Sequence, residues 1–303
     1  MKLEYKHQGP TEVVYTEAWT PDAISYEEGT REKSTVFAPG ETSFQFLLPH
    51  HRYLSKKSNS RAPIQFWMEI LSYRLGCLFG VTVPPAFISI DSSGECRALI
   101  EWFYKDENFL TSYASGYSTI KGLDSDIDKE KGTRHRLNLT YATIDMIVRW
   151  RQASLNQVKG SILAWIVKKF ADTDLEKLIS DLSIRENFVR IFVFDALIAN
   201  TYRHHENWGL VIDVSKLVLG EISPVFTLSP AFDNGTSLGY NFLEEKLPDY
   251  LKAPNWFKQY ASRCTHHLRR EAGSAQFKHD ELIQVLLQNH PDCFVFSGKH
   301  RIF

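Results

Sequence analysis

The sequence has 303 residues and a net charge of -1, from 35 lysines and arginines against 36 aspartates and glutamates. Its hydrophobic content of 43% and aromatic content of 13% exclude wholesale disorder. The near-neutral charge argues against direct nucleic-acid binding, because proteins dedicated to that task usually carry a basic excess. No apolar run is long enough to span a membrane, and no apolar signal-peptide core follows the first residues. We therefore expect a globular cytoplasmic chain of one large domain or two lobes.

Cysteines, acidic residues and histidines can form metal sites or disulfides. In this sequence, however, none of these three groups has the spacing that such a site requires. The cysteines lie far apart without a CxxC pair, which predicts reduced thiols; they are Cys77, Cys96, Cys264 and Cys293. The acidic group Asp124, Asp126 and Asp128 lacks the glycine and terminal glutamate of a calcium loop, so we interpret 105–136 as a polar, irregular linker. The pairs His50–His51 and His266–His267 indicate surface or hydrogen-bonded histidines.

The first fifty residues contain short runs of β-formers, which predict strands at 11–16 and 44–48. Between them, 21–41 is polar and punctuated by glycine and proline, which indicates a loop. In a kinase, a loop at this point would cover the nucleotide phosphates. It has neither a G-x-G-x-x-G pattern nor a P-loop signature, so an ordinary surface loop explains it equally well.

A strand ending in lysines is predicted at 51–57, followed by a helix from 64 to 79. Pro63 and Gly80 stand at the helix ends, where proline and glycine are expected. The apolar face is predicted from residues at helical spacing: Phe66, Ile70, Tyr73 and Cys77, widened by Trp67, Leu71 and Leu78.

Glu69 lies among these apolar positions, where a carboxylate is costly unless it is paired. A lysine on the preceding strand is the natural partner, with Lys56 the best candidate and Lys57 the alternative. A strand lysine paired with a helix glutamate is the arrangement by which protein kinases hold the α- and β-phosphates. The competing interpretation is an exposed lysine pair and a surface glutamate.

The remaining elements follow from turn signals and periodicity. A hairpin is predicted from 83–90, a turn at 91–94, and 96–104. Helices are predicted at 139–150, 156–170, 174–182 and 183–199, the last with a capping box from Ser183 and Glu186, and further helices at 255–270 and 279–289. These runs predict a mainly helical second half.

A polar cluster interrupts this pattern directly after the apolar helix. Residues 200–209 read N-T-Y-R-H-H-E-N-W-G, a β-like stretch follows at 210–212, and Asp233 comes after a short hairpin. Phosphoryl transfer needs a carboxylate to orient the attacking hydroxyl, and carboxylate or amide oxygens for magnesium. A base and an asparagine five residues apart in a tight loop would place both groups at one cleft.

This segment resembles the catalytic loop of HipA-like kinases, N-T-D-R-H-x-x-N-W-G, and 226–235 resembles their L-x-P-x-x-D segment. The runs 80–86 and 99–104 also resemble the small lobe of that family, so the resemblance extends from about 52 to 234. It implies an α+β, bilobal protein-kinase-like fold. A small β-rich lobe with one helix would occupy 1–104, and a larger, mainly helical lobe 105–303.

The resemblance also implies a serine/threonine kinase that uses ATP and Mg²⁺. Lys56 or Lys57, with Glu69, would hold the phosphates, and the backbone of Glu101, Trp102 and Phe103 would face the adenine. Asn207 and Asp233 would bind the metal, and Arg203 and His204 would shape the loop and help hold charge there. His205 and Glu206 occupy its variable positions. Implied partners are a protein substrate and an antitoxin, since such kinases are often the toxin of bacterial toxin–antitoxin modules.

Tyr202 stands where the family has its catalytic aspartate. A phenol has a pKa of about 10 and is therefore neutral and a poor proton acceptor at neutral pH. Either the chain is a natural pseudokinase that still binds nucleotide, or an active toxin kinase has been inactivated at this residue. A kinase for a lipid or small molecule is the third alternative, because phosphatidylinositol kinases share the D-R-H-x-x-N loop.

Overall fold

The computed structural model describes residues 6–22, 31–103, 111–115, 181–213, 226–242, 244–269 and 274–294. The helices predicted at 139–150 and 156–170, nearly all of 174–182, and the acidic group at 124–128 lie outside these residues. The chain divides into two compact units, which are described separately. The first combines Met1–Phe103, Leu197–Thr201 and Pro230–Cys264, and the second combines Tyr104–Ala196, Tyr202–Ser229 and Thr265–Phe303. The two lobes expected at 1–104 and 105–303 stay a prediction.

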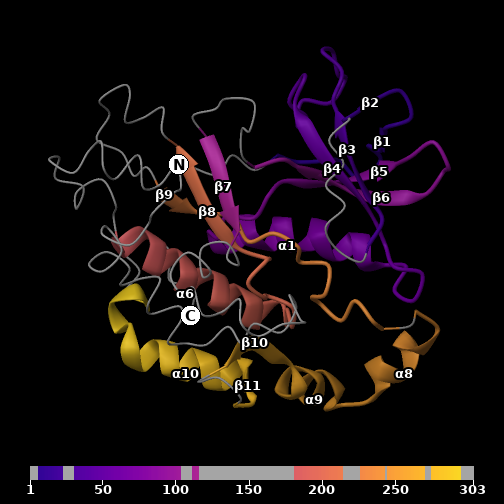
Figure 1. The fold of residues 1–303 in the computed structure, drawn as a ribbon. Helices are drawn as coiled ribbons and strands as arrows, with labels where there is room; N and C mark the ends of the chain where they lie inside the picture. Colours follow the sequence, from indigo (N-terminus) through magenta and orange to yellow (C-terminus); the bar gives the residue numbers. More distant parts are fainter. Residues whose placement is uncertain are drawn as a thin grey trace, which may run out of the picture. The chain divides into compact units, whose positions relative to one another are not determined.

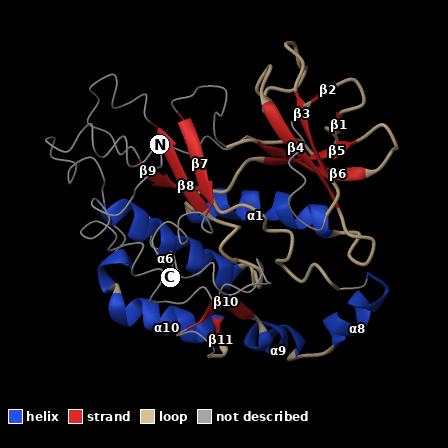
Figure 2. Ribbon diagram, in the orientation of Figure 1, coloured by secondary structure: helices blue, strands red, loops and turns tan. Residues whose placement is uncertain are grey.

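The first unit is built on a six-stranded sheet with the order β1-β5-β6-β4-β3-β2 (Figures 1 and 2). Only β1 and β5 pair in parallel, and the other neighbours are antiparallel. The strands are β1 (Val14–Tyr15), β2 (Thr20–Pro21), β3 (Lys33–Phe37), β4 (Arg52–Lys57), β5 (Ala86–Ile90) and β6 (Cys96–Glu101). The predicted strand ending in lysines and the predicted hairpin are therefore confirmed as β4 and β5–β6.

The helix α1 (Gln65–Phe79) packs against β5 and β6, and it ends at Gly80 as predicted. Gly80 has a φ of 69°, in the left-handed region where glycine pays no Cβ penalty. Strand β4 lies between β6 and β3, and all of its residues are buried or half-buried. Lys56 is only 6% exposed in this strand, which places a charged group in the interior and demands a counter-charge nearby.

The predicted main face of α1 is confirmed at Phe66, Ile70 and Tyr73, which are buried, but its predicted widening is not. Trp67, Leu71 and Leu78 are 38%, 38% and 71% exposed, so the predicted widening of the apolar face is wrong. Small and polar residues are buried instead, among them Ser72 and Gly76. A Cβ on Gly76 would lie 2.5 Å from the Val83 side chain. The buried face of α1 is therefore set by how closely the helix backbone approaches Val83, and not by the number of apolar residues on that face.

Two predictions in the first fifty residues are wrong. The segment 44–48 is a turn rather than a strand, with the Leu47 N–H donating to the Phe44 carbonyl at 3.2 Å. Two of its apolar side chains, Phe46 and Leu47, are buried, and Phe46 packs onto the sheet with its ring centroid 4.7 Å from that of Phe87. The polar stretch 21–41, predicted as a loop, contains β3, which pairs with β4 along five residues of each strand. Ladder pairing outweighs the polar composition there.

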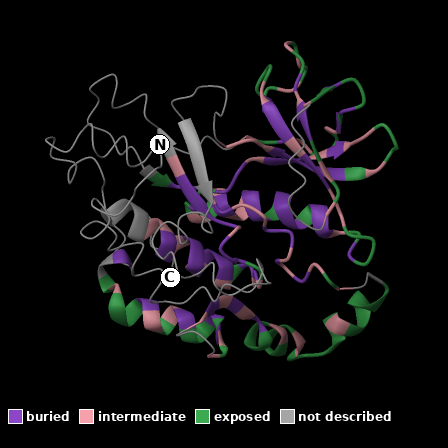
Figure 3. Cartoon of the chain, in the orientation of Figure 1, coloured by how far each residue is buried: buried purple, intermediate pink, exposed green. Residues whose placement is uncertain are grey.

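The first unit also contains η3 (Glu244–Lys246), α8 (Leu247–Lys252) and α9 (Trp256–Arg263). No residue of α8 or α9 is buried (Figure 3). The helix predicted at 255–270 is therefore too long. It stops at Arg263, because Cys264 has extended backbone angles and the chain continues into a strand.

The second unit contains two small antiparallel sheets and two main helices among its described residues. The sheets are β7-β8-β9, from Thr111–Ser115, Gly209–Asp213 and Phe226–Leu228, and β10-β11, from Thr265–Arg269 and Gln276–Lys278. The helices are α6 (Asp181–Leu197) and α10 (His279–Asn289), and η4 (Pro291–Phe294) follows α10.

The strand predicted after the polar cluster is confirmed as β8, and the helix predicted at 279–289 is confirmed as α10. Two predictions are wrong: β7 lies within the stretch expected to be irregular, and α6 already includes Asp181, so Ser183 is not its N-cap. The four cysteines are thiols, as predicted. Among the described residues, no helix combines the length and apolar character needed to cross a bilayer.

Candidate functional site

Three of the predicted site residues meet in the first unit. Lys56 on β4 donates through Nζ to Glu69 Oε1 on α1 at 2.9 Å, and also to Asp233 Oδ1. The side chains of Lys56 and Glu69 are 8% and 3% exposed, so each compensates for the desolvation of the other. The predicted pairing of Glu69 with Lys56 is therefore confirmed. Lys57 points elsewhere, with its Nζ 2.7 Å from Glu95.

Arg31, which the sequence patterns do not predict, is a fourth member of this cluster. Its Nη2 lies 2.5 Å from Asp233 Oδ1 and 3.3 Å from Glu69 Oε1. Two cations and two carboxylates thus form one cluster, which we call the charge cluster. Nothing in the local pattern around Arg31 marks it as a site residue, because it follows a polar stretch of sequence and lies 202 residues from Asp233.

The segment that carries Asp233 is held firmly within the first unit. The Ala231 N–H donates to the Thr82 carbonyl at 2.8 Å, and the Asn234 N–H donates to Glu69 Oε2 at 2.9 Å. Asp233 itself has a φ of 56°, in the left-handed region that few non-glycine residues occupy. Its side chain remains 29% exposed. The backbone therefore presents the carboxylate at a place that a ligand can reach.

The predicted hinge follows the end of β6, and part of its backbone is already engaged. The Trp102 N–H donates to the Arg52 carbonyl at 3.0 Å, and the Trp102 carbonyl lies 3.0 Å from His51 Nε2. The Glu101 N–H donates to the Pro85 carbonyl at 2.8 Å. An adenine at this segment would have to use other backbone groups or displace these bonds.

Phe103, the last predicted hinge residue, stacks on Phe232 with ring centroids 5.3 Å apart. This contact joins the end of the hinge to the residue that precedes Asp233. The predicted adenine-binding segment and the predicted metal-binding aspartate are thereby linked inside the first unit.

In the second unit, the predicted loop residues form a tight hydrogen-bonded turn. The Tyr202 carbonyl accepts from the His204 N–H at 2.9 Å and from Asn207 Nδ2 at 2.7 Å. Arg203 Nη1 donates to the Asn207 carbonyl at 3.0 Å. Because the amide nitrogen of Asn207 is used inside the loop, the amide oxygen is the end of this side chain that can serve a metal ion.

Arg203 is bound by Asp195, a partner that the sequence pattern did not predict. Its guanidinium donates twice to Asp195 on α6, at 2.8 and 3.0 Å, and His266 Nε2 lies 3.2 Å from the same carboxylate. All three side chains are completely buried. The charge of Arg203 and the bonds from His266 and Arg203 outweigh burial and hold the pKa of Asp195 well below its usual range. The signal available in the sequence was an aspartate within an apolar helical run.

Tyr202 lies at the surface of this loop and is 42% exposed. Its ring packs edge-on against His204, with centroids 4.6 Å apart, and against His267 at 6.2 Å. Burial lowers the pKa of His267, which favours its neutral form. The position at which the resemblance predicts a catalytic aspartate is therefore occupied by an aromatic side chain that packs against its neighbours.

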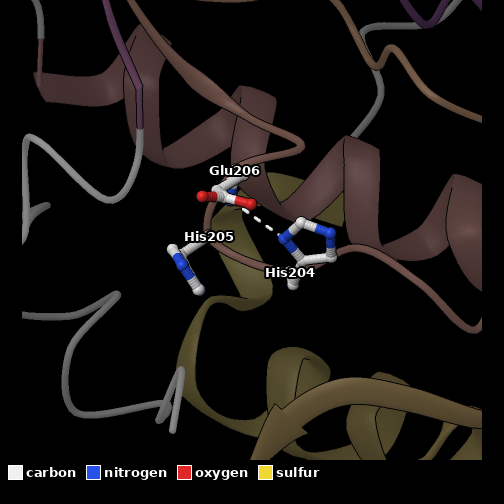
Figure 4. A group of neighbouring side chains, drawn as sticks. All are labelled: His204, His205 and Glu206. Atoms are coloured by element: carbon white, nitrogen blue, oxygen red, sulfur yellow. Dashed lines mark hydrogen bonds between the residues drawn. The ribbon is translucent and has the colours of Figure 1, made fainter. Parts of the chain in front are cut away.

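His204, His205 and Glu206 lie close together in the same loop (Figure 4). One potential ligand atom from each falls within 4.8 Å of the others. However, His204 Nδ1 already accepts the Glu206 N–H at 3.1 Å, and imidazole nitrogens suit zinc rather than magnesium. The oxygen ligands that Mg²⁺ prefers are offered instead by the Asn207 amide and the Asp233 carboxylate. Each side chain by itself, Asp233 in the first unit and Asn207 in the second, therefore has ligand chemistry that suits the implied ion.

Comparison with known proteins identifies a kinase-like fold. No protein-family model matches the chain, and no curated protein matches it. Among solved structures, the chain is similar to the crystal structure of a Helicobacter pylori proinflammatory kinase, CtkA, with a TM-score of 0.60. The match covers 93% of this chain and 83% of that one at 12% sequence identity. At this identity the likeness shows the fold alone.

Proposed function

We propose that the chain is a HipA-like serine/threonine protein kinase in fold and ligand binding, with phosphoryl transfer impaired because Tyr202 replaces the catalytic aspartate. It would bind ATP with Mg²⁺ and act on a protein substrate. The observation that carries the proposal is the convergence of Lys56, Glu69 and Asp233. These residues come from a strand, a helix and a distant segment, and they form the set that holds phosphates and metal in protein kinases.

Each unit would contribute a different part of the chemistry. In the first, Lys56 would neutralise phosphate oxygens while Glu69 keeps its ammonium in place. Asp233 would hold Mg²⁺, which supplies positive charge to the phosphates when bound. In the second unit, Asn207 is the further metal ligand that the family resemblance implies. Arg203, locked by Asp195, would keep the loop carbonyls and the Asn207 amide in fixed positions.

At position 202, the resemblance predicts a carboxylate that accepts or orients the proton of the attacking hydroxyl. A phenol with an ordinary pKa of about 10 stays protonated at neutral pH, so Tyr202 cannot take this role. Nucleotide binding should persist, because none of its proposed ligands depends on Tyr202.

Replacing Tyr202 with aspartate tests this assignment. We expect Tyr202→Asp to transfer radiolabelled phosphate from ATP to serine or threonine, on itself or on added protein, while the parent chain transfers little. General-base groups typically contribute about 10²- to 10⁴-fold in rate, which sets the expected gain. The matched control is Tyr202→Asn, which has nearly the same shape as aspartate but no carboxylate. Equal transfer by both variants would refute a role for the carboxylate.

The second candidate is a natural pseudokinase that binds nucleotide for regulation. Its support is the packing of Tyr202 against His204 and His267, which shows that the loop accommodates the phenol. Nucleotide binding without any transfer by Tyr202→Asp would favour it. Labelling of a lipid or small molecule instead of protein would favour the third alternative.

The implied antitoxin partner, bacterial origin and cytoplasmic location belong to the same proposal and rest on the family resemblance. Expression of Tyr202→Asp in bacteria should inhibit growth if the chain is a toxin kinase. Unchanged growth, together with clear phosphate transfer in vitro, would separate kinase activity from toxicity.

A further inference from the structure

Arg31 occupies a nearly enclosed place in the charge cluster, with a side chain that is 12% exposed. The same carboxylate oxygens that accept from Lys56 also accept from Arg31, namely Glu69 Oε1 and Asp233 Oδ1. Lys56 alone already contacts both carboxylates. The second cation is therefore additional to the lysine–glutamate pair that a kinase requires.

The backbone leaves space for this guanidinium. A Cβ built on Gly235 would lie 2.4 Å from Arg31 Nη1 and 2.8 Å from Nη2. These distances are shorter than any ordinary contact, so Arg31 can stay where it is only because residue 235 lacks a side chain. Gly235 follows Asp233 by two residues, and the same short segment thus supplies both the carboxylate and the space beside it.

The position of Arg31 in the sequence favours a role in phosphate binding. It stands two residues before β3, at the end of the connection from β2 to β3. In kinases, the corresponding loop covers the nucleotide phosphates. Guanidinium groups bind phosphate through two parallel N–H bonds, which a lysine cannot reproduce.

We propose that Arg31 is a phosphate-binding residue that rests on Asp233 until a metal–nucleotide complex enters. This inference rests on the proposed function, because it requires ATP to bind beside Lys56 and Asp233. Arg31 gives up Asp233 Oδ1 to the metal and donates to phosphate oxygens instead. After the exchange, the Arg31 guanidinium pairs with phosphate and the Asp233 carboxylate pairs with the metal ion. Neither charge is therefore left without a counter-charge.

Metal binding without nucleotide gives the first test. Mn²⁺ is the probe, because its paramagnetic signal reports the bound fraction directly. Arg31→Gln should bind Mn²⁺ about tenfold more tightly than the parent chain, because a charge-assisted bond to Asp233 no longer has to be broken. Arg61→Gln removes the same charge from an exposed residue of the same unit and should leave Mn²⁺ binding unchanged.

Nucleotide binding gives the second test, in which Arg31→Gln should lower the affinity instead of raising it. By calorimetry, Arg31→Gln should weaken binding of Mg·ATP about tenfold and leave binding of adenosine, which has no phosphates, unchanged. Arg31→Lys should recover part of the lost Mg·ATP affinity, since it restores the positive charge but not the two parallel N–H bonds of a guanidinium. Thermal unfolding of each variant confirms that it is folded before its affinities are compared.

Gly235→Ala moves the guanidinium without removing its charge. The new methyl group would collide with the end of a flexible side chain, so the backbone can remain in place while Arg31 shifts. We expect tighter Mn²⁺ binding here as well. This variant keeps the proposal testable if Arg31→Gln does not fold.

The outcomes separate the two proposals. If the parent chain binds Mg·ATP and Arg31→Gln binds both Mn²⁺ and Mg·ATP as the parent does, Arg31 has no such role and the kinase proposal stands. Equal losses for Mg·ATP and adenosine would indicate a purely structural residue and would also overturn the inference. If the parent chain does not bind Mg·ATP at all, the proposed function fails and the role of Arg31 fails with it.

Discussion

The two units each contain an arginine bonded to an aspartate, in very different surroundings. In the second unit, Arg203 and Asp195 make a two-bond contact with His266 beside them, and all three side chains are completely buried. In the first unit, Arg31 contacts Asp233 through one nitrogen, and the Asp233 side chain is 29% exposed. The same pair of residue types thus forms a sealed contact in one unit and an accessible one in the other.

This difference indicates which cluster supports the fold and which can exchange partners. A sealed ion pair cannot open without exposing a bare charge to the protein interior, so its partners stay together. An accessible pair loses little when a ligand replaces one member, because water and the ligand take over the lost bonds. We therefore expect Asp195 to be required for stability and Asp233 for ligand binding.

The largest expected effect is on the buried aspartate. Asp195→Asn keeps the shape of the side chain but leaves Arg203 without a counter-charge, which should lower the free energy of unfolding by about 3–5 kcal/mol. Urea denaturation measures the change. The control is Glu186→Gln on the same helix, whose carboxylate contacts Arg190 at 2.5 Å near the surface, with an expected cost below about 0.5 kcal/mol. Similar losses of unfolding free energy for Asp195→Asn and Glu186→Gln would show that the buried ion pair matters no more than the surface one.

The next effect is on acid stability. The pKa of Asp195 is held below its ordinary value of 3.8, so the folded state resists protonation more than the unfolded state does. The contribution of Asp195 is therefore present above about pH 4 and is lost as the pH falls toward the depressed pKa. Unfolding free energies measured at decreasing pH should show the gap between the parent chain and Asp195→Asn narrowing in this range. A constant gap would contradict a depressed pKa.

The smallest expected effect on stability is at the accessible aspartate. Asp233→Asn makes the same chemical change, yet Arg31 and Lys56 both keep Glu69 as a partner. We expect a loss of about 1 kcal/mol or less in urea denaturation. Binding of Mn²⁺ should nevertheless fall sharply, because the metal-binding carboxylate is gone. A stability loss as large as that of Asp195→Asn would show that both clusters are structural.

The features that could be predicted from the sequence are those with a local signal. The helix α1 follows from apolar spacing with proline and glycine at its ends, and the hairpin β5–β6 follows from its turn residues. The pair Lys56–Glu69 was also predictable, because it joins adjacent elements only 13 residues apart and because a lone carboxylate on an apolar helix face needs a cation. Residues 44–48 show the limit, since their β-forming composition belongs to a turn that buries only Phe46 and Leu47.

The sequence by itself determined β4, α1 and the hairpin β5–β6 of the first unit, and the motif at 200–209 with tyrosine where the family resemblance predicts aspartate. Only the tertiary structure decided that Arg31 meets Asp233 across 202 residues, and that Asp195 meets His266 across 71. Helical and strand periodicities report which face of an element is buried, but not which distant charge it meets. Burial of one charge creates the demand for another, and the fold selects the residue that supplies it.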